Sequence, residues 1–473
     1  MLMVEQISSL ISWVDGVVWG LPLIILVLLV GIQFTIRMGL LQVRHLPRAL
    51  KYMVKNEEGG KGEVSSFGAL CTALSATIGT GNIVGVATAI VAGGPGALFW
   101  MWIAAFFGMA TKYAEGLLAI KYRNIDADGH VLGGPFYYIE NGMGKNWKWL
   151  AKAFAFFGAC AGLLGIGTMT QINGISNSVH NFFDAKNEWT VSLLGNSYSW
   201  TVVITAVVVT LCAGLVIIGG LKRIASVSEI VVPFMAILYV IAAIIVVCVN
   251  YKAIPDALVQ VFEGAFGLRA IGGGALGAML VAMQKGIARG IFSNESGLGS
   301  APIAAAAAQT HEPVRQGLVS MTGTFIDTII ICTITGLCII TTGAWNIGLE
   351  GAAVTQHAFK SGFPFAPTVG AFILMLSLVF FAFTTIIGWN YYSERCMEYL
   401  TNGNMKSVIV YRWLYIIAVF IGPFLTIKAV WNIADIFNGL MAFPNLLALL
   451  ALSGVVVAET KKYFAKAKEG KLK

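Results

Sequence analysis

The feature that most constrains this chain is a polar, glycine-rich turn in the middle of an apolar stretch. Residues 67–92 could cross a bilayer, but their centre reads Gly79-Thr80-Gly81-Asn82. Glycine weakens a helix, and Thr and Asn side chains compete for its backbone hydrogen bonds. Inside hydrocarbon, an opened backbone persists only where it faces a cavity enclosed by protein. Residues 75–85 therefore predict a broken membrane helix that holds a small solute and an ion, or alternatively a close helix-packing face.

The composition predicts an all-α polytopic membrane protein. Only 11% of the 473 residues are charged and the mean hydropathy is +0.79, whereas soluble domains carry about 25% charged residues. The seven cysteines lack CxxC spacing and predict neither a disulfide framework nor a metal centre. The five histidines lie at or near loops, without HExxH or GxSxG motifs, so we expect no catalytic residues and no enzyme.

Eleven spans are predicted from the apolar segments. They are 17–35, 67–92, 97–120, 149–179, 200–219, 227–249, 271–292, 317–342, 368–392, 408–427 and 431–457. We divide the chain into an N-terminal surface segment with one span and a linker (1–63), two five-helix repeats (64–252 and 253–457) and a basic tail (458–473).

The basic residues predict an orientation in the plasma membrane. If residues 37–61 are cytoplasmic, that side receives all but five of the 31 Lys and Arg residues. This bias agrees with the positive-inside rule. The N-terminus is then outside and the C-terminus cytoplasmic. The net charge of +8 fits this orientation, and no nucleic-acid partner or obligatory protein partner is expected.

A second glycine run, residues 271–277 (IGGGALG), occupies the matching place in the second half. Alone it could be a loop or a helix-crossing point. Glycine-interrupted segments at corresponding positions of oppositely oriented halves are typical of inverted-repeat transporters. Neither break contains a charged residue. Half-helix amino ends hold a carboxylate and carbonyl ends suit a cation, so a small zwitterion fits best.

Four blocks of sequence carry a family resemblance. They are residues 93–108 (GGPGALFWMWIAAFFG), 112–116 (KYAEG), 290–302 (GIFSNESGLGSAP) and 325–328 (FIDT). They are similar to the alanine or glycine:cation symporter family over nearly the whole chain. The resemblance implies sodium-coupled uptake of alanine, possibly glycine, and the five-plus-five inverted repeat of leucine-transporter-like proteins, preceded here by one N-terminal helix.

The resemblance also implies binding residues. The substrate carboxylate would lie on the N–H groups of Thr80 and Gly81, and the ammonium and methyl groups would face the second glycine run. The implied substrate residues are Thr77, Gly79, Thr80, Gly81, Gln171, Gly273, Gly274, Leu276, Gly277 and Trp389. The implied sodium ligands are Ser75, Ile78, Phe381, Thr384 and Thr385.

Several of these residues also have structural interpretations. Gln171 could form an interhelical hydrogen bond, Trp389 could simply pack, and the Thr384-Thr385 pair could bond its own helix. Asn82 and Asp327 could hold a second cation or fix the first broken helix. A further group, predicted as ion pairs near the cytoplasmic mouth or an interfacial charge cluster, comprises Arg289, Glu295, Glu394 and Arg395.

The predicted mechanism is alternating access with sodium as the coupling ion. Proton-coupled relatives can place a Lys ammonium where sodium would bind, on the helix that corresponds to residues 227–249. These residues contain no Lys, which favours sodium over protons as the coupling ion. A proton-coupled permease and a uniporter or channel stay open as alternatives, since broken helices also build selectivity filters.

Overall fold

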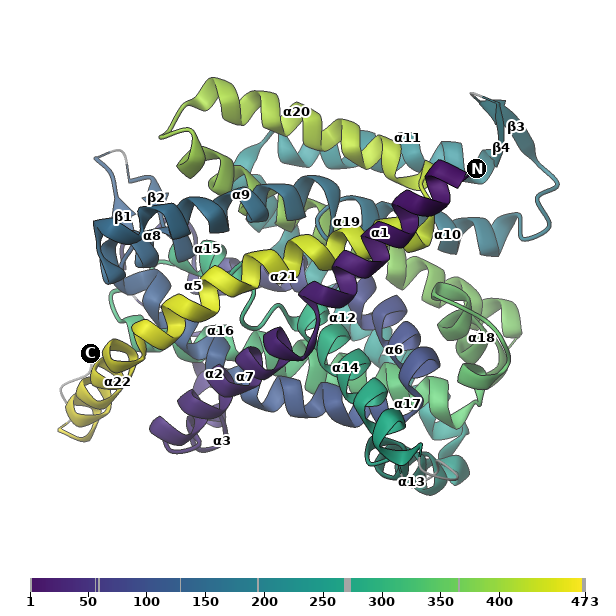
Figure 1. The fold of residues 1–473 in the computed structure, drawn as a ribbon, viewed down its shortest axis with the longest axis horizontal. Coiled ribbons are helices and arrows are strands. Elements are labelled where there is room, and N and C mark those ends of the chain that lie inside the picture. Colours follow the sequence, from purple (N-terminus) through teal and green to yellow (C-terminus); the bar gives the residue numbers. More distant parts are fainter. Residues whose placement is uncertain are drawn as a thin grey trace.

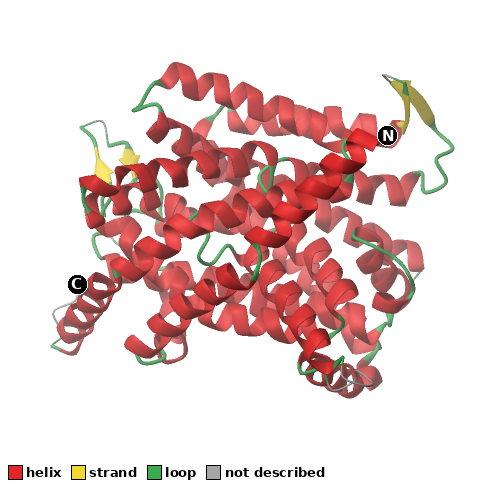
Figure 2. Ribbon diagram, viewed as in Figure 1, coloured by secondary structure: helices red, strands yellow, loops and turns green. Residues whose placement is uncertain are grey.

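The computed structural model describes residues 2–55, 57, 60–127, 129–193, 195–267, 274–364 and 366–469. Within these ranges the chain is almost entirely helical, with two short antiparallel hairpins (Figure 2). The hairpins are β1 (Asn124–Ile125) with β2 (Val131–Leu132), and β3 (Thr190–Leu193) with β4 (Asn196–Ser199).

The helices of the first half begin with two that together form the N-terminal span. The bounds are α1 (Leu2–Val18), α2 (Leu21–Arg37), α3 (Leu41–Arg44), α4 (Leu46–Val54), α5 (Ser66–Thr77), η1 (Gly81–Gly85), α6 (Val86–Gly93), α7 (Gly96–Lys121), α8 (Pro135–Tyr137), η2 (Tyr138–Met143), η3 (Lys145–Trp147), α9 (Lys148–Leu164), α10 (Met169–Phe183), α11 (Trp200–Ile217) and α12 (Gly220–Val249).

The second half follows with a similar set. The bounds are η4 (Tyr251–Ala253), α13 (Ile254–Ala265), α14 (Ala275–Asn294), α15 (Ala301–Ala306), α16 (Pro313–Thr324), η5 (Phe325–Cys332), α17 (Thr333–Thr341), η6 (Ala344–Asn346), α18 (Ala352–Gly362), α19 (Pro367–Leu400), α20 (Met405–Ile421), η7 (Gly422–Phe424), α21 (Ile427–Ala451) and α22 (Ser453–Lys468).

Nine helical segments of the described residues are long and apolar enough to cross a membrane. The bent pair of α5 with η1 and α6 makes ten. These ten correspond to ten of the eleven predicted spans. The eleventh, α14, is not among these candidate spans, so the count of eleven is not confirmed.

The arrangement separates buried central helices from lipid-facing outer ones. Helix α7 packs against α14 and α16, and α19 packs against α9, α10 and α12. Apolar side chains on α11, α12 and α20 are exposed, as for Leu211, Ile230 and Val410, which suits helices that face lipid. The hairpins β1–β2 and β3–β4 lie at opposite ends of the molecule, as do the two termini (Figure 1).

The N-terminal residues form a helix on the surface of the bundle. Residues 1–16, expected as a surface segment, lie mostly in α1, which packs along α21 (Figure 1). The indole N–H of Trp19, just after α1, donates to the Asp435 carbonyl at 2.8 Å, and Asn432 Nδ2 donates to Ser12 Oγ at 2.9 Å. Trp19 is buried by this contact, whereas the apolar side chains of Leu10, Trp13 and Val17 on α1 are exposed.

Candidate functional site

The first predicted break is present. Helix α5 ends at Thr77, the π-helical turn η1 begins at Gly81, and the two half-helices are bent by 49°. The freed N–H of Gly79 donates to Asn82 Oδ1 at 2.9 Å, and that of Thr80 donates to Gln171 Oε1 at 3.0 Å. Two side-chain amides therefore satisfy backbone groups that the helix has given up.

Gln171 joins two irregular segments. While its Oε1 accepts from Thr80, its Nε2 donates to the carbonyl of Ile166 at 2.9 Å, between α9 and α10. The predicted single span over 149–179 is thus interrupted at the level of the first break. Gly79 is closely enclosed, because an added Cβ would lie 2.4 Å from Thr385 Oγ1 and 2.9 Å from Gln171 Oε1.

Three of the proposed sodium ligands share one hydrogen-bonded group of oxygens. The hydroxyl of Thr385 lies 3.2 Å from the carbonyl oxygen of Ile78 and 3.0 Å from that of Phe381. Thr384 also donates to the Phe381 carbonyl, at 2.9 Å, but its hydroxyl lies 3.4 Å from Met235 Sδ on α12. The grouped oxygens are hard ligands of the kind that an alkali cation takes.

Two other predicted residues of α5 bond within their own helix. The Ser75 hydroxyl donates to the Thr72 carbonyl at 2.8 Å and packs where Gly388 leaves room on α19. The Thr77 hydroxyl donates to the Ala73 carbonyl at 3.0 Å. Both hydroxyls therefore bond the backbone of α5, and the carbonyl of Ser75 stays the group predicted to meet the cation.

The described part of the second glycine run lies at the surface of the bundle. Gly273 lies outside the described residues, and Gly274, Leu276 and Gly277 lie at the start of an intact α14. Leu276 is 63% exposed, and a Cβ at Gly277 would meet no atom within 4 Å. The described part of this run is therefore on the outside of the bundle, and its assignment to the substrate site is corrected.

Helix α14 instead ends at Asn294, and the chain is non-helical until α15 begins at Ala301. Glu295, Gly297 and Gly299 have φ values of 57°, 86° and 81°. The unwound segment 295–300 is fully buried. It also adjoins the first break, because an added Cβ at Gly81 would lie 3.0 Å from the Cα of Ser293.

Charged side chains hold the second break. Lys112 Nζ donates to the carbonyl of Asn294 at 2.8 Å, and Glu115 Oε1 accepts from the N–H of Gly297 at 3.1 Å. Asn445 on α21 donates to both Glu115 Oε1 and the Gly297 carbonyl, at 2.7 and 2.9 Å. Hydrogen bonds to charged groups are stronger than neutral ones, and here they replace the lost helical bonds.

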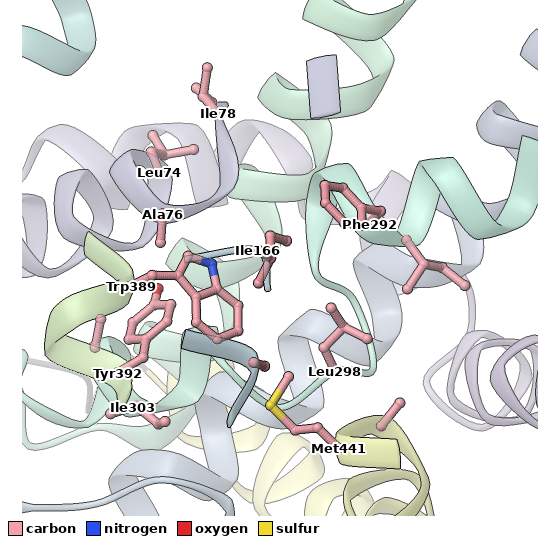
Figure 3. Close-up of a cluster of buried hydrophobic side chains, with 14 of the residues drawn as sticks. Leu74, Ala76, Ile78, Ile166, Phe292, Leu298, Ile303, Trp389, Tyr392 and Met441 are labelled. Atoms are coloured by element: carbon pink, nitrogen blue, oxygen red, sulfur yellow. The ribbon is translucent and has the colours of Figure 1, made fainter. Parts of the chain in front are cut away.

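Glu295 and Trp389 form a buried pair. The indole N–H of Trp389 donates to Glu295 Oε1 at 2.6 Å, and the Ser300 hydroxyl donates to Oε2 at 2.8 Å. Glu295 is completely buried, so its expected place among ion pairs at the cytoplasmic mouth is wrong. Figure 3 shows the Trp389 ring beside Ala76 of the first broken helix, with Phe292 and Leu298 across from it.

Asn82 and Asp327 link the first break to α14. Asn82 Nδ2 donates to Asp327 Oδ1 at 2.7 Å, and the hydroxyls of Ser293 and Thr328 donate to Oδ2 at 2.9 and 2.7 Å. All four side chains are buried. Both carboxylate oxygens therefore have protein donors, an arrangement that suits the structural interpretation of this pair.

The other predicted ion pairs are present but separate. Arg289 makes a bidentate contact with Asp435 at 2.8 and 2.7 Å, and its guanidinium lies 4.7 Å from the ring centroid of Trp431. Glu394 pairs with Arg412 at 2.7 Å. Arg395 lies on Glu398 at 2.5 Å. These are local pairs on different helix faces rather than one gate.

The sequence interpretation missed the roles of Lys112, Glu115 and Asn445. A Lys and a Glu three residues apart in an apolar helix were a usable signal, since charges inside a membrane span usually face the bundle interior and pair there. Asn445 carried no comparable signal.

The fold defines the class of protein. The crystal structure of MhsT in complex with L-phenylalanine matches with a TM-score of 0.55 at 14% identity, over 85% of this chain and 99% of that chain. The chain is thus a multi-pass membrane protein of the leucine-transporter-like fold.

Its family is shown by sequence. The profile of the sodium:alanine symporter family matches residues 4–473, and the chain belongs to that family of transporters. It is 54% identical to an uncharacterized transporter of Haemophilus influenzae, over 98% of this chain and 97% of the relative. It is 46% identical to the sodium/alanine symporter AgcS of Methanococcus maripaludis, over 96% of this chain and 97% of that relative.

Proposed function

We propose that this chain couples the entry of sodium to uptake of a small neutral amino acid, alanine and possibly glycine, by alternating access. One observation carries the proposal: two sides of a single unwound turn face different partners. The Ile78 carbonyl meets the Thr385 hydroxyl at 3.2 Å, while the Thr80 N–H meets Gln171 Oε1 at 3.0 Å. The carbonyl side suits a cation and the N–H side suits a carboxylate.

The substrate would replace an internal hydrogen bond. A carboxylate oxygen would take the place of Gln171 Oε1 on the Thr80 N–H. The buried Thr80 hydroxyl, which has no hydrogen-bond partner in the described part of the chain, would add a second donor. The ammonium would lie toward the carboxyl end of α14, where helix carbonyls carry partial negative charge. Phe292 and Trp389 would enclose the methyl group.

Sodium would bind the oxygens of Ile78, Phe381 and Thr385. The Thr385 hydroxyl hydrogen would turn away, so that its oxygen faces the ion. The ion would join α5 to α19, and substrate and ion together would stabilise the closed state. Each needs a preference of only a few kcal/mol for that state to shift the population.

The proposed topology keeps the N-terminus outside, the C-terminus in the cytoplasm and two five-helix repeats at 64–252 and 253–457. In the second repeat the broken helix is α14 with α15. It replaces the glycine run 271–277 as the partner of the first break.

Uptake of radiolabelled alanine into proteoliposomes tests the coupling. An inward sodium gradient should drive accumulation. Thr385→Ala should raise the sodium concentration for half-maximal uptake by about tenfold, since one hydrogen-bonding ligand is worth about 1 kcal/mol or more. Thr384→Ala is the matched control, because that hydroxyl bonds its own helix and Met235.

Four outcomes would contradict the proposal. Alanine uptake that ignores the sodium gradient would remove the coupling. Accumulation driven by a proton gradient alone would favour a proton-coupled permease, and single-channel currents would favour a channel. Equal sodium responses of the two Thr variants would show that the ion site lies elsewhere.

A further inference from the structure

Asn438, in the middle of α21, is completely buried, and neither polar atom of its carboxamide has a hydrogen-bond partner among the described residues. Among the described side chains, only Asn438 has two buried polar atoms without a hydrogen-bond partner. Each unsatisfied buried polar atom costs about 1–3 kcal/mol. An apolar residue of the same size would avoid this cost, so the carboxamide indicates a ligand.

The neighbours of Asn438 along α21 show where it points. Residues seven apart on a helix lie on nearly the same face. Trp431, one heptad earlier, lies with its ring centroid 4.8 Å from that of Phe292. Asn445, one heptad later, donates to the Gly297 carbonyl. Asn438 therefore faces the region between Phe292 and Gly297, where α14 ends and the second break begins.

Residues on either side of Asn438 show which helices lie next to its side chain. An added Cβ at Gly165 would lie 3.0 Å from the Cα of Ala434, and one at Gly158 would lie 3.5 Å from Met441 Sδ. These contacts place α9 on one side of Asn438. On the other side, Asp435 holds Arg289 of α14. The carboxamide thus points between α9 and the end of α14.

The surroundings at this level are apolar. Ile166, Phe292, Leu298, Trp389 and Met441 gather around one region in Figure 3. All five belong to one buried cluster. The walls therefore offer packing contacts, and a hydrogen bond to Asn438 would have to come from whatever enters.

We propose that Asn438 is a specificity-determining residue that hydrogen-bonds the side chain of the transported amino acid. This inference rests on the proposed function. It extends the substrate class from alanine to short neutral amino acids whose side chain ends in a hydroxyl, with serine preferred over an apolar amino acid of equal size.

Serine and 2-aminobutyrate test the proposal, because they differ by a hydroxyl against a methyl group. Each competes with radiolabelled alanine for sodium-dependent uptake, and each is also tested by thermal shift of the purified protein. The native protein should favour serine over 2-aminobutyrate by about tenfold. Asn438→Leu should abolish or reverse this preference, because a site that loses its polar partner no longer distinguishes a hydroxyl.

Asn438→Leu should also unfold at a higher temperature than the native protein, since it removes two unsatisfied atoms at similar volume. Asn438→Val is the second variant if the leucine is too large. Asn432→Leu is the matched control, since Asn432 lies on the same helix but bonds Ser12 of α1; its serine preference should be unchanged.

The outcomes separate the two proposals. A serine preference that is absent in the native protein, or unchanged in both Asn438 variants while alanine uptake persists, overturns this inference alone. If the native protein neither binds alanine in the thermal-shift assay nor takes it up with sodium, the proposed function fails and this inference fails with it.

Discussion

The two broken helices meet at the centre of the molecule but are held open by different chemistry. At the first break, backbone N–H groups meet the neutral carboxamides of Asn82 and Gln171. At the second, the backbone meets the charged groups of Lys112 and Glu115. A neutral hydrogen bond contributes about 1 kcal/mol and a ligand can replace it. A buried charge cannot lose its partner without a much larger cost.

This difference assigns different tasks to the two segments. The first break is the exchangeable part, where substrate and ion would displace internal partners. The second is a fixed wall, tied to α7 and α21 by Lys112, Glu115 and Asn445. Substitutions at the second break should therefore reduce stability, and substitutions at the first should reduce transport while the protein stays folded.

The largest expected effect is on stability, from Lys112→Met. The substitution leaves the Asn294 carbonyl without its donor and removes the cation from a buried region that holds Glu115 and Glu295. Breaking a buried charge pair by removing one partner costs about 3–5 kcal/mol. Unfolding of the purified protein by denaturing detergent would measure the loss. Lys121→Met, which removes a partly exposed pair with Glu459, is the control and should cost under about 1 kcal/mol. Equal losses would show that the second break is not held by charge.

The next effect is on transport, from Gly79→Ala. The added methyl group would meet Thr385 Oγ1 at 2.4 Å and Gln171 Oε1 at 2.9 Å, so the groups assigned to both ligands must move. Displacing catalytic or binding groups by even an ångström costs on the order of 100-fold, and we expect a loss of that size in alanine uptake. Gly277→Ala is the matched control, because its methyl group would meet nothing within 4 Å.

This pair of glycines also decides between two positions for the second break. If Gly277→Ala abolished uptake and Gly79→Ala did not, the glycine run 271–277 would be the functional element, as the sequence pattern suggested. Unchanged uptake in Gly277→Ala would argue against that element.

Much of the fold follows from local chemistry that a sequence displays. Apolar segments of sufficient length mark the spans, and Gly79-Thr80-Gly81-Asn82 marks the first break because glycine and short polar side chains weaken a helix locally. The leucine-transporter-like fold was also predicted, and the comparison with MhsT confirms it.

The second break was misplaced because its causes are not local. Residues 272–274 contain more glycine than residues 295–300, but the described part of that run, from Gly274 onward, lies at the surface. The unwound segment contains Glu295 and Gly297, whose bonds come from Glu115 of α7, Trp389 of α19 and Asn445 of α21. Which distant helix supplies a donor depends on packing, so a glycine count cannot locate such a break. The same holds for Thr384 and Thr385, adjacent in sequence but bonded toward different helices.

The smallest expected effect lies far from both breaks, in the loop between β1 and β2. His130 lies between two carboxylates, with Nδ1 3.0 Å from Glu63 and Nε2 3.2 Å from Glu398. Hydrogen bonds to Glu398 and Glu63 raise the pKa of His130 from its ordinary 6.5 to about 9. Because the folded pKa is the higher one, this contribution to stability is complete below pH 6.5 and is lost as the pH rises through 9.

His130→Gln should therefore lower the unfolding temperature at pH 6 and make little difference near pH 10. The pair is partly exposed, so the contribution at pH 6 should be about 1 kcal/mol or less. Thermal unfolding of both proteins across this range measures the difference, and His357→Gln on α18 serves as the control. A difference that stays constant with pH would mean that His130 supports the loop by packing. In either case sodium-coupled uptake should be unchanged at pH 7, because this loop touches neither break.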